Sequence, residues 1–181
     1  MKAIMKAMNA ALFSALALAS FPDWAQSTGP TDPQIAAIVV TANQVDIDAG
    51  KLAESKSKSA DVKAFAERMV TDHSGVNQAA VALVHKLGVT PQENPTSQSL
   101  KQGGDDNLTK LKALGGTKFD RAYIDHEVTY HQSVLDALDK TLIPNAQNEE
   151  LKALLVKVRP AFVAHLEHAK HLQADLGKSG A

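Results

Sequence analysis

Acidic and histidine side chains fall within otherwise apolar helical stripes of this chain. Asp46, His73, His131 and His165 each do so, and Glu127 precedes His131 by about one helical turn. Burying such groups is costly unless they are paired, hydrogen-bonded or bound to a metal. Helical bundles build metal sites from inward-facing imidazole and carboxylate groups. We therefore take these five residues as a candidate set of metal ligands.

The same residue types allow two interpretations. Imidazole suits zinc, copper and iron, and carboxylate suits harder ions, so this mixed set is compatible with zinc, copper or iron. Alternatively, the acids hydrogen-bond the histidines and form a structural network without any ligand. Asp72, next to His73, and Glu127 supply partners for either interpretation. His165 lies further from its connecting turn than His131, so the sequence does not decide whether the set converges.

The remaining histidines are sorted by the same helical spacing. His85, His126 and His171 fall on the polar sides of their helices, and His168 falls at the edge of a stripe. We expect the first three to be exposed to solvent, and His73, His131 and His165 to be buried.

Apolar residues recur with the 3.6-residue period of helices along most of the chain, which predicts an all-α fold. The expected helices cover 33–55 after an Asp32 cap, 59–87 ending at Gly88, 117–142 after a Thr117 cap, and 148–176. Pro160 should kink or split the last of these. Between the second and third helices, residues 100–114 are weakly helical and interrupted by Gly103-Gly104. We expect a long crossover there that contains a short helix.

The first residues have the features of an export signal. Lys2 and Lys6 precede the apolar run 11–18, which is shorter than the ~20 residues that span a bilayer. Small residues permit cleavage after Ala19 or Ala25. We expect residues 1–25 to be a signal peptide, residues 26–181 to form one domain, and the mature protein to be periplasmic or secreted.

Composition excludes several classes of function. The chain has no cysteine, so thiolate ligands, thiol nucleophiles and disulfides are absent. A formal charge of −1 and the lack of a basic stripe argue against binding to nucleic acid. After the signal, no stretch is long and apolar enough to cross a membrane. Phosphate loops, G-x-S-x-G elbows and H-E-x-x-H zinc motifs are also missing. The sequence does not indicate a protein partner or an oligomeric state.

Three segments resemble a known family. They are 65–73 (Phe-Ala-Glu-Arg-Met-Val-Thr-Asp-His), 119–123 (Phe-Asp-Arg-Ala-Tyr), and His131 followed by Pro160 and His165. The chain is similar there to exported bacterial ferritin-like domains catalogued as a domain of unknown function, DUF4142, and often labelled outer membrane or secreted proteins. The resemblance extends over about 33–176 and implies a ferritin-like four-helix bundle in the cell envelope. It implies no established activity.

The chain departs from ferritin-like di-iron chemistry. Such sites take Glu from two helices and Glu-x-x-His from two others. Here the first helix offers Asp46, and Glu-x-x-His is missing from the second and fourth. This argues against a di-iron oxidase or an iron store, and a single zinc or copper ion fits better. We hold three hypotheses: a metal-binding bundle, a structural or interaction module, and, least supported, a metal-dependent oxidoreductase.

Overall fold

The computed structural model describes residues 29–178, and every regular element in this range is a helix. The elements are α1 (Asp32–Lys56), α2 (Ala60–Leu87), α3 (Pro95–Lys112), α4 (Gly116–Ala137), the π-helix η1 (Leu138–Leu142), α5 (Ile143–Asn145) and α6 (Glu149–Lys178). The predicted all-α fold is confirmed for these residues. The predicted signal peptide, residues 1–25, lies outside the described range.

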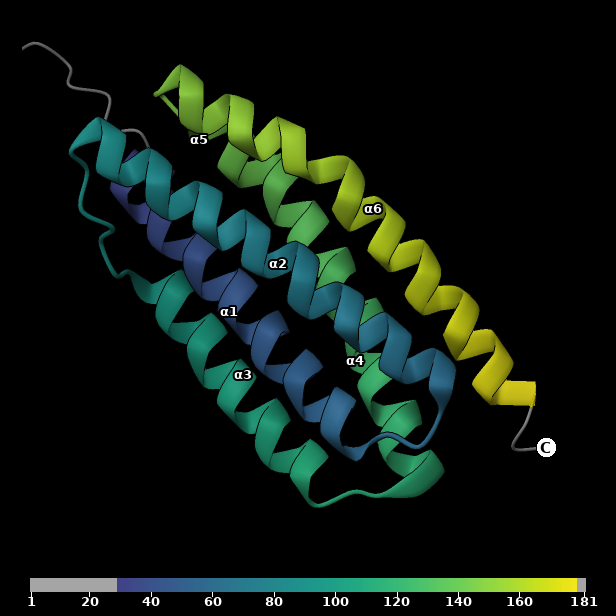
Figure 1. Ribbon diagram of the computed structural model, residues 1–181. Helices are drawn as coiled ribbons and strands as arrows, with labels where there is room; N and C mark the ends of the chain where they lie inside the picture. Colours follow the sequence, from purple (N-terminus) through teal and green to yellow (C-terminus); the bar gives the residue numbers. More distant parts are fainter. Residues whose placement is uncertain (1–28, 179–181) are drawn as a thin grey trace, which may run out of the picture.

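The helices form an elongated bundle (Figure 1). Helices α1, α2, α4 and α6 run along a common long axis, and α3 lies on the outside, packed mainly against α1. Because α2 ends and α4 begins at opposite ends of the bundle, α3 serves as the connection between them. The expected crossover is therefore present, but it is a helix of 18 residues rather than a short one.

The helix ends follow the sequence signals in part. Ser59 caps α2 by accepting a hydrogen bond from the Val62 N–H, and Gly88 ends the helix with φ +63°, where glycine avoids the steric cost of a side chain. Two predicted caps are wrong by one or two residues. Thr31, not Asp32, precedes α1, and Gly115, not Thr117, precedes α4.

Asp32 instead connects two helices. Its carboxylate accepts hydrogen bonds from the backbone N–H groups of Gln147 and Asn148, each at 2.9 Å. Asn148 in turn caps α6, because its Oδ1 atom accepts hydrogen bonds from the backbone N–H groups of Glu150 and Leu151. Pro160 lies inside α6 and is exposed, and the helix continues through it, so the predicted split does not occur.

Gly103-Gly104 does not interrupt α3, contrary to the sequence-based expectation. Gly104 is buried, and a Cβ atom at that position would lie 2.7 Å from the Val45 side chain of α1. This glycine therefore permits α3 to approach α1 closely. Gly103 has open space around it, with nothing within 4 Å of the position of a Cβ.

The core has two apolar clusters with a polar layer between them. One cluster contains Ile38 and Leu155 and lies toward η1, and the other contains Ala53 and Phe65 and lies toward the opposite end. Buried polar residues from four helices make up this layer; they are Asn43 and Asp46 on α1, His73 on α2, Glu127 and His131 on α4, and His165 on α6. Apolar packing on both sides therefore shields this layer from solvent.

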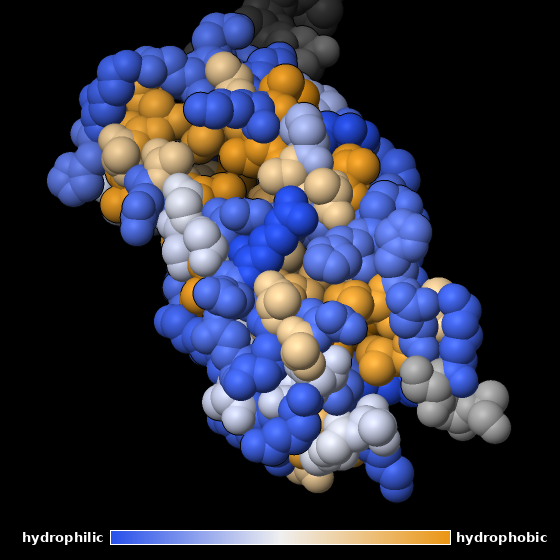
Figure 2. Space-filling view, turned by 45° about the vertical axis from the view of Figure 1, so that its right-hand side comes forward, coloured by the Kyte–Doolittle hydropathy of each residue, from blue (hydrophilic) through white to orange (hydrophobic). Residues whose placement is uncertain are grey.

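The surface is mostly polar on the face drawn in Figure 2. Apolar side chains gather there in two areas, a hollowed one toward the end of the bundle that carries α5 and another near the end of α6. Within residues 29–178, no helix combines the length and apolar character that crossing a membrane requires.

The two adjacent glycines of α3 provide a test of the α1–α3 packing. Gly103→Ala should stabilise the protein by about 0.5–1 kcal/mol, because alanine loses less backbone entropy in a helix. Gly104→Ala should instead destabilise it by roughly 1 kcal/mol or more, because the methyl group overpacks against Val45. Urea unfolding of both variants measures the difference. Equal gains from the two substitutions would contradict the close packing.

Candidate metal centre

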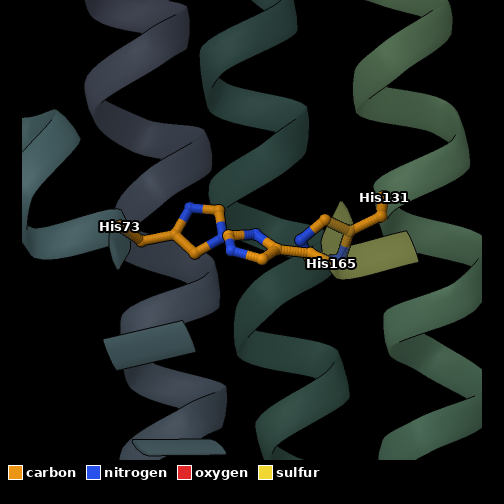
Figure 3. Close-up of side chains that lie close together, drawn as sticks. All are labelled: His73, His131 and His165. Atoms are coloured by element: carbon orange, nitrogen blue, oxygen red, sulfur yellow. The ribbon is translucent and has the colours of Figure 1, made fainter. Parts of the chain in front are cut away.

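Three histidines from three helices meet in the polar layer. His73 of α2, His131 of α4 and His165 of α6 extend toward one another (Figure 3). Their ring centroids are 5.2–5.5 Å apart, and one nitrogen of each ring lies within 4.8 Å of the other two. All three rings are buried, as predicted. The structure thus resolves the question of convergence that the sequence left open.

The orientation of His73 is fixed by a chain of hydrogen bonds that begins on α1. The Asn43 side-chain N–H donates to the Val39 carbonyl at 2.8 Å, which assigns its amide orientation. Its Oδ1 atom lies 2.7 Å from His73 Nδ1 and can only accept, so Nδ1 carries the proton. Phe162 stacks on the same ring with centroids 5.1 Å apart. The bare Nε2 atom of His73 therefore faces the centre of the bundle.

His131 and His165 are held in the same way. His131 Nδ1 lies 3.0 Å from the Glu127 backbone carbonyl, which can only accept a hydrogen bond. His165 Nε2 lies 2.8 Å from the Asp72 carboxylate. Each ring therefore donates its outer N–H, and its other nitrogen keeps a lone pair.

The inner nitrogens have no hydrogen-bond partner among the described residues. They are His73 Nε2, His131 Nε2 and His165 Nδ1. Buried polar atoms rarely lack a partner, and each such atom calls for an explanation. Three lone pairs that point into one dry space repel each other but together form a donor set for a cation.

Two carboxyl groups extend the cluster on one side. Asp46 Oδ2 lies 3.2 Å from His73 Nε2 and 3.7 Å from His131 Nε2. Glu127 Oε2 lies 3.3 Å from His131 Nδ1. One donor atom each from Asp46, Glu127 and His131 lies within 4.8 Å of the others. All five candidate residues therefore occupy one buried layer.

Burial sets the protonation of these acids when no cation is present. It raises the pKa of Asp46 well above its usual value, and the neighbouring Glu127 charge raises it further. Burial also raises the pKa of Glu127 to about 7, although contacts with Asp46 and Tyr123 oppose the rise. A neutral Asp46 can donate to the bare nitrogen of His73.

His73 and His165 are disfavoured as cations for the same reason. Burial lowers the pKa of His73 well below its usual value, and the charges of His131 and His165 lower it further. Burial also lowers the pKa of His165 to about 4, against the hydrogen bond to Asp72. Burial alone would raise the pKa of Asp72, but its bonds to His165 and Arg68 lower it overall. Neutral imidazole is the form that binds metals.

One predicted exposure is wrong. His85 and His171 are exposed as expected, whereas His126 is half-buried and stacks on Tyr130 with centroids 5.4 Å apart. Burial lowers the pKa of His126 to about 4. The pattern of its own helix suggested a solvent-facing residue, but α3 lies near this side of α4, and His126 borders the same hollow as Gly103.

Sequence reasoning missed or misassigned three contributors to the site. Asn43 gave no signal, because a single amide in an apolar stripe is common. Asp72 was expected to pair with its neighbour His73, but it pairs with His165 from another helix. Tyr123 was noted only as part of the segment 119–123, yet its buried hydroxyl affects the pKa of Glu127. Such pairings between helices depend on the azimuth of each helix, which hydrophobic spacing defines only coarsely.

The pKa of Glu127 predicts a pH-dependent stability for protein treated with chelator. Folded Glu127 keeps its proton up to about pH 7, whereas the unfolded side chain loses it near pH ~4.3. The folded state then binds more protons in this window, so the contribution of Glu127 falls as pH rises. Glu127→Gln removes that loss and should gain stability relative to the wild type between pH 5 and 8, by roughly 3 kcal/mol at most.

Urea unfolding at each pH measures this difference, with chelator present throughout. Exposed Glu67→Gln serves as the control and should show a constant offset from the wild type. If Glu127→Gln also ran parallel to the wild-type curve, the inferred protonation of Glu127 would be wrong.

Comparison with known proteins places this site in a family without an assigned activity. No curated protein and no solved structure matches the chain. One family model matches residues 19–172, which include every residue of the candidate centre. The chain therefore belongs to the family described as a domain of unknown function, DUF4142.

Proposed function

We propose that this protein binds one divalent metal ion between His73, His131 and His165, with Asp46 as the fourth ligand. The observation that supports this proposal is that the two nitrogens of each imidazole have different environments. Each outer N–H is given to an acceptor on the protein, and each inner nitrogen lacks a partner. Metal-binding histidines almost always have this arrangement, since the outer bond fixes the tautomer and raises the basicity of the ligand.

A purely structural network explains less of the geometry. It accounts for the three outer hydrogen bonds. It leaves the inner nitrogens to a single donor, protonated Asp46, which can satisfy only one of them at a time. Each buried group left without a partner costs about 1–3 kcal/mol. A cation satisfies all three nitrogens and lets Asp46 ionise.

The donor set favours zinc, with copper as the next candidate. Three imidazoles and one carboxylate match the ligands and the coordination number of zinc. Copper also accepts imidazole, whereas iron in ferritin-like sites is held mainly by carboxylates. Glu127 lies beside Asp46 and His131. It would influence the charge of these ligands and would not itself bind the ion in place of a histidine. A binding role is therefore better supported than catalysis.

The ferritin-like topology and the cellular location belong to the same proposal. The ferritin-like assignment is supported by the four long helices and the crossover between the second and third of them. Export is supported by the basic start and the apolar run of residues 11–18. An exported bundle with one buried metal would act as a metal buffer or a metal-stabilised module of the cell envelope.

Zinc should stabilise the wild type and not a variant that lacks two ligands. A metal that binds only folded protein stabilises it by about 2.7 kcal/mol at a hundredfold excess over Kd. We expect the melting temperature of chelator-treated wild type to rise when zinc or copper is restored. The double variant His73→Ala, His131→Ala should show no rise, and zinc bound per chain should fall from near one to near zero.

The exposed His85→Ala and His171→Ala variants are the matched controls and should respond as the wild type does. Because the double variant could lose its fold, circular dichroism is recorded in parallel. His165→Ala provides a second variant and should weaken zinc binding on its own. A wild-type melt that ignores zinc, copper and iron after chelation would refute the metal proposal and favour the structural network.

Asn43 should support the metal without contacting it. Asn43→Ala removes the acceptor that fixes the His73 tautomer. Loss of such a supporting bond typically weakens metal affinity 10–100-fold. Competition with a chromogenic chelator measures the zinc Kd of this variant. Exposed Gln44→Ala, at the next position of α1, is the control and should keep the wild-type Kd. An unchanged Kd for Asn43→Ala would show that the tautomer is set by something else.

A further inference from the structure

A chamber of about 160 Å³ opens directly beside the histidine cluster. Asp46, His73 and His131 line its inner end together with Phe162, and all four are buried. The rest of its wall is largely apolar and comes from α1, α3, α4, η1 and α6. Neither a metal with four protein ligands nor a packing network needs this space.

The inner end of the chamber presents unsatisfied polar atoms. Nε2 of His73, Nε2 of His131 and Oδ1 of Asp46 have no hydrogen-bond partner among the described residues. The three side chains are only 1–3% exposed. These atoms belong to buried side chains that border the space. A neutral Asp46 can donate to only one of the two nitrogens, so an occupant with one hydroxyl would give the other a donor that the chain does not supply.

The size and the apolar lining of the chamber limit which molecules it can bind. An apolar cavity of ~150 Å³ accommodates benzene, so a single six-membered ring matches the size of this chamber. Burial of a net charge would be costly, which excludes ions as the body of the ligand. The flat ring of Phe162 at the inner end favours a planar aromatic partner over a branched aliphatic one.

A route to the surface lies between α3 and α4. Thr96 of α3 and Ser133 of α4 are exposed members of the chamber wall. A larger surface hollow of about 520 Å³ shares Thr96, Leu100 and Tyr130 with the chamber. Tyr130 also donates a hydrogen bond to the Ala42 carbonyl at 2.9 Å, which holds α4 against α1 at this point. The ligand would therefore enter past α3, the helix outside the main bundle.

We propose that this chamber binds a small uncharged aromatic molecule carrying one hydrogen-bonding group, of which phenol is the simplest, with that group directed at His73 and His131. The proposal deepens the proposed function, on which it rests for the role of the polar group. Without metal, the hydroxyl donates to the imidazole nitrogen that Asp46 leaves without a donor. With metal, the ion would occupy both nitrogens, and the hydroxyl would instead donate to the Asp46 carboxylate oxygen that has no partner.

Phenol itself is the probe, with benzene as its counterpart lacking the hydroxyl. Titration is followed by the imidazole signals in nitrogen–proton NMR spectra and by the melting temperature, on chelator-treated and on zinc-loaded protein. We expect saturable binding, shifts at His73 and His131 but not at exposed His85, and a Kd for benzene at least tenfold weaker than for phenol.

Ala137→Leu tests the location of the bound ring. Ala137 lines the chamber and is half-buried, so leucine would fill part of the space without breaking α4. We expect phenol binding to weaken at least tenfold in this variant. Exposed Gln132→Leu introduces the same side chain on α4 away from the chamber and should bind phenol as the wild type does. Val134→Phe, which fills the chamber from a neighbouring position, replaces Ala137→Leu if that variant fails to fold.

The outcomes separate this inference from the metal proposal. The chamber proposal is supported if chelator-treated wild type binds phenol and Ala137→Leu does not, whether or not either protein binds zinc. The metal proposal is supported if Ala137→Leu binds zinc with the affinity of the wild type, whether or not it binds phenol. Absence of saturable phenol binding, or equal binding by Ala137→Leu and the wild type, overturns the chamber proposal.

Discussion

Each of the three central histidines is held by the hydrogen bond of its outer N–H group, and this constraint organises the middle of the bundle. The acceptors are Asn43 on α1, the Glu127 carbonyl on α4 and Asp72 on α2. Two of the three bonds join different helices. They therefore fix the rotation of α1, α2 and α6 about their own axes as well as the tautomers of the rings.

The polar layer depends on the two apolar clusters beside it. Leucine, isoleucine, valine and phenylalanine side chains on both sides exclude water and supply most of the favourable free energy of folding. The same exclusion of water makes the inner nitrogens and the carboxyl groups of Asp46 and Glu127 costly to bury. The bundle thus concentrates its least favourable groups where they can act together on a ligand.

Helix α3 gives the bundle its asymmetry. It covers one side of α1 through the close contact at Gly104 and reaches only the edge of α4. One consequence is the half-buried position of His126. Another is that α3 and α4 together form the outer wall of the chamber that borders the histidines. A bundle of the four long helices alone would leave that space open to water.

The sequence by itself determined the helices and most of the buried set. Hydrophobic spacing identified four long helices and placed His73, His131 and His165 on inward faces, because a 3.6-residue period records which face is apolar. It also indicated Asp46 and Glu127 as core acids. It predicted an interruption of the helix at Gly103-Gly104, because glycine has a low helix propensity. The sequence does not reveal the close contact with Val45 that requires glycine at position 104.

Only the tertiary structure decided which of these residues meet. Convergence depends on the relative heights and rotations of four helices, and a shift of one residue along a helix moves a side chain by about 1.5 Å along the helix axis. The pairing of Asp72 with His165, the support of His73 by Asn43 and the chamber beside them arise from contacts between helices. Periodicity within one helix contains no information about its neighbours, so these features could not be predicted from it.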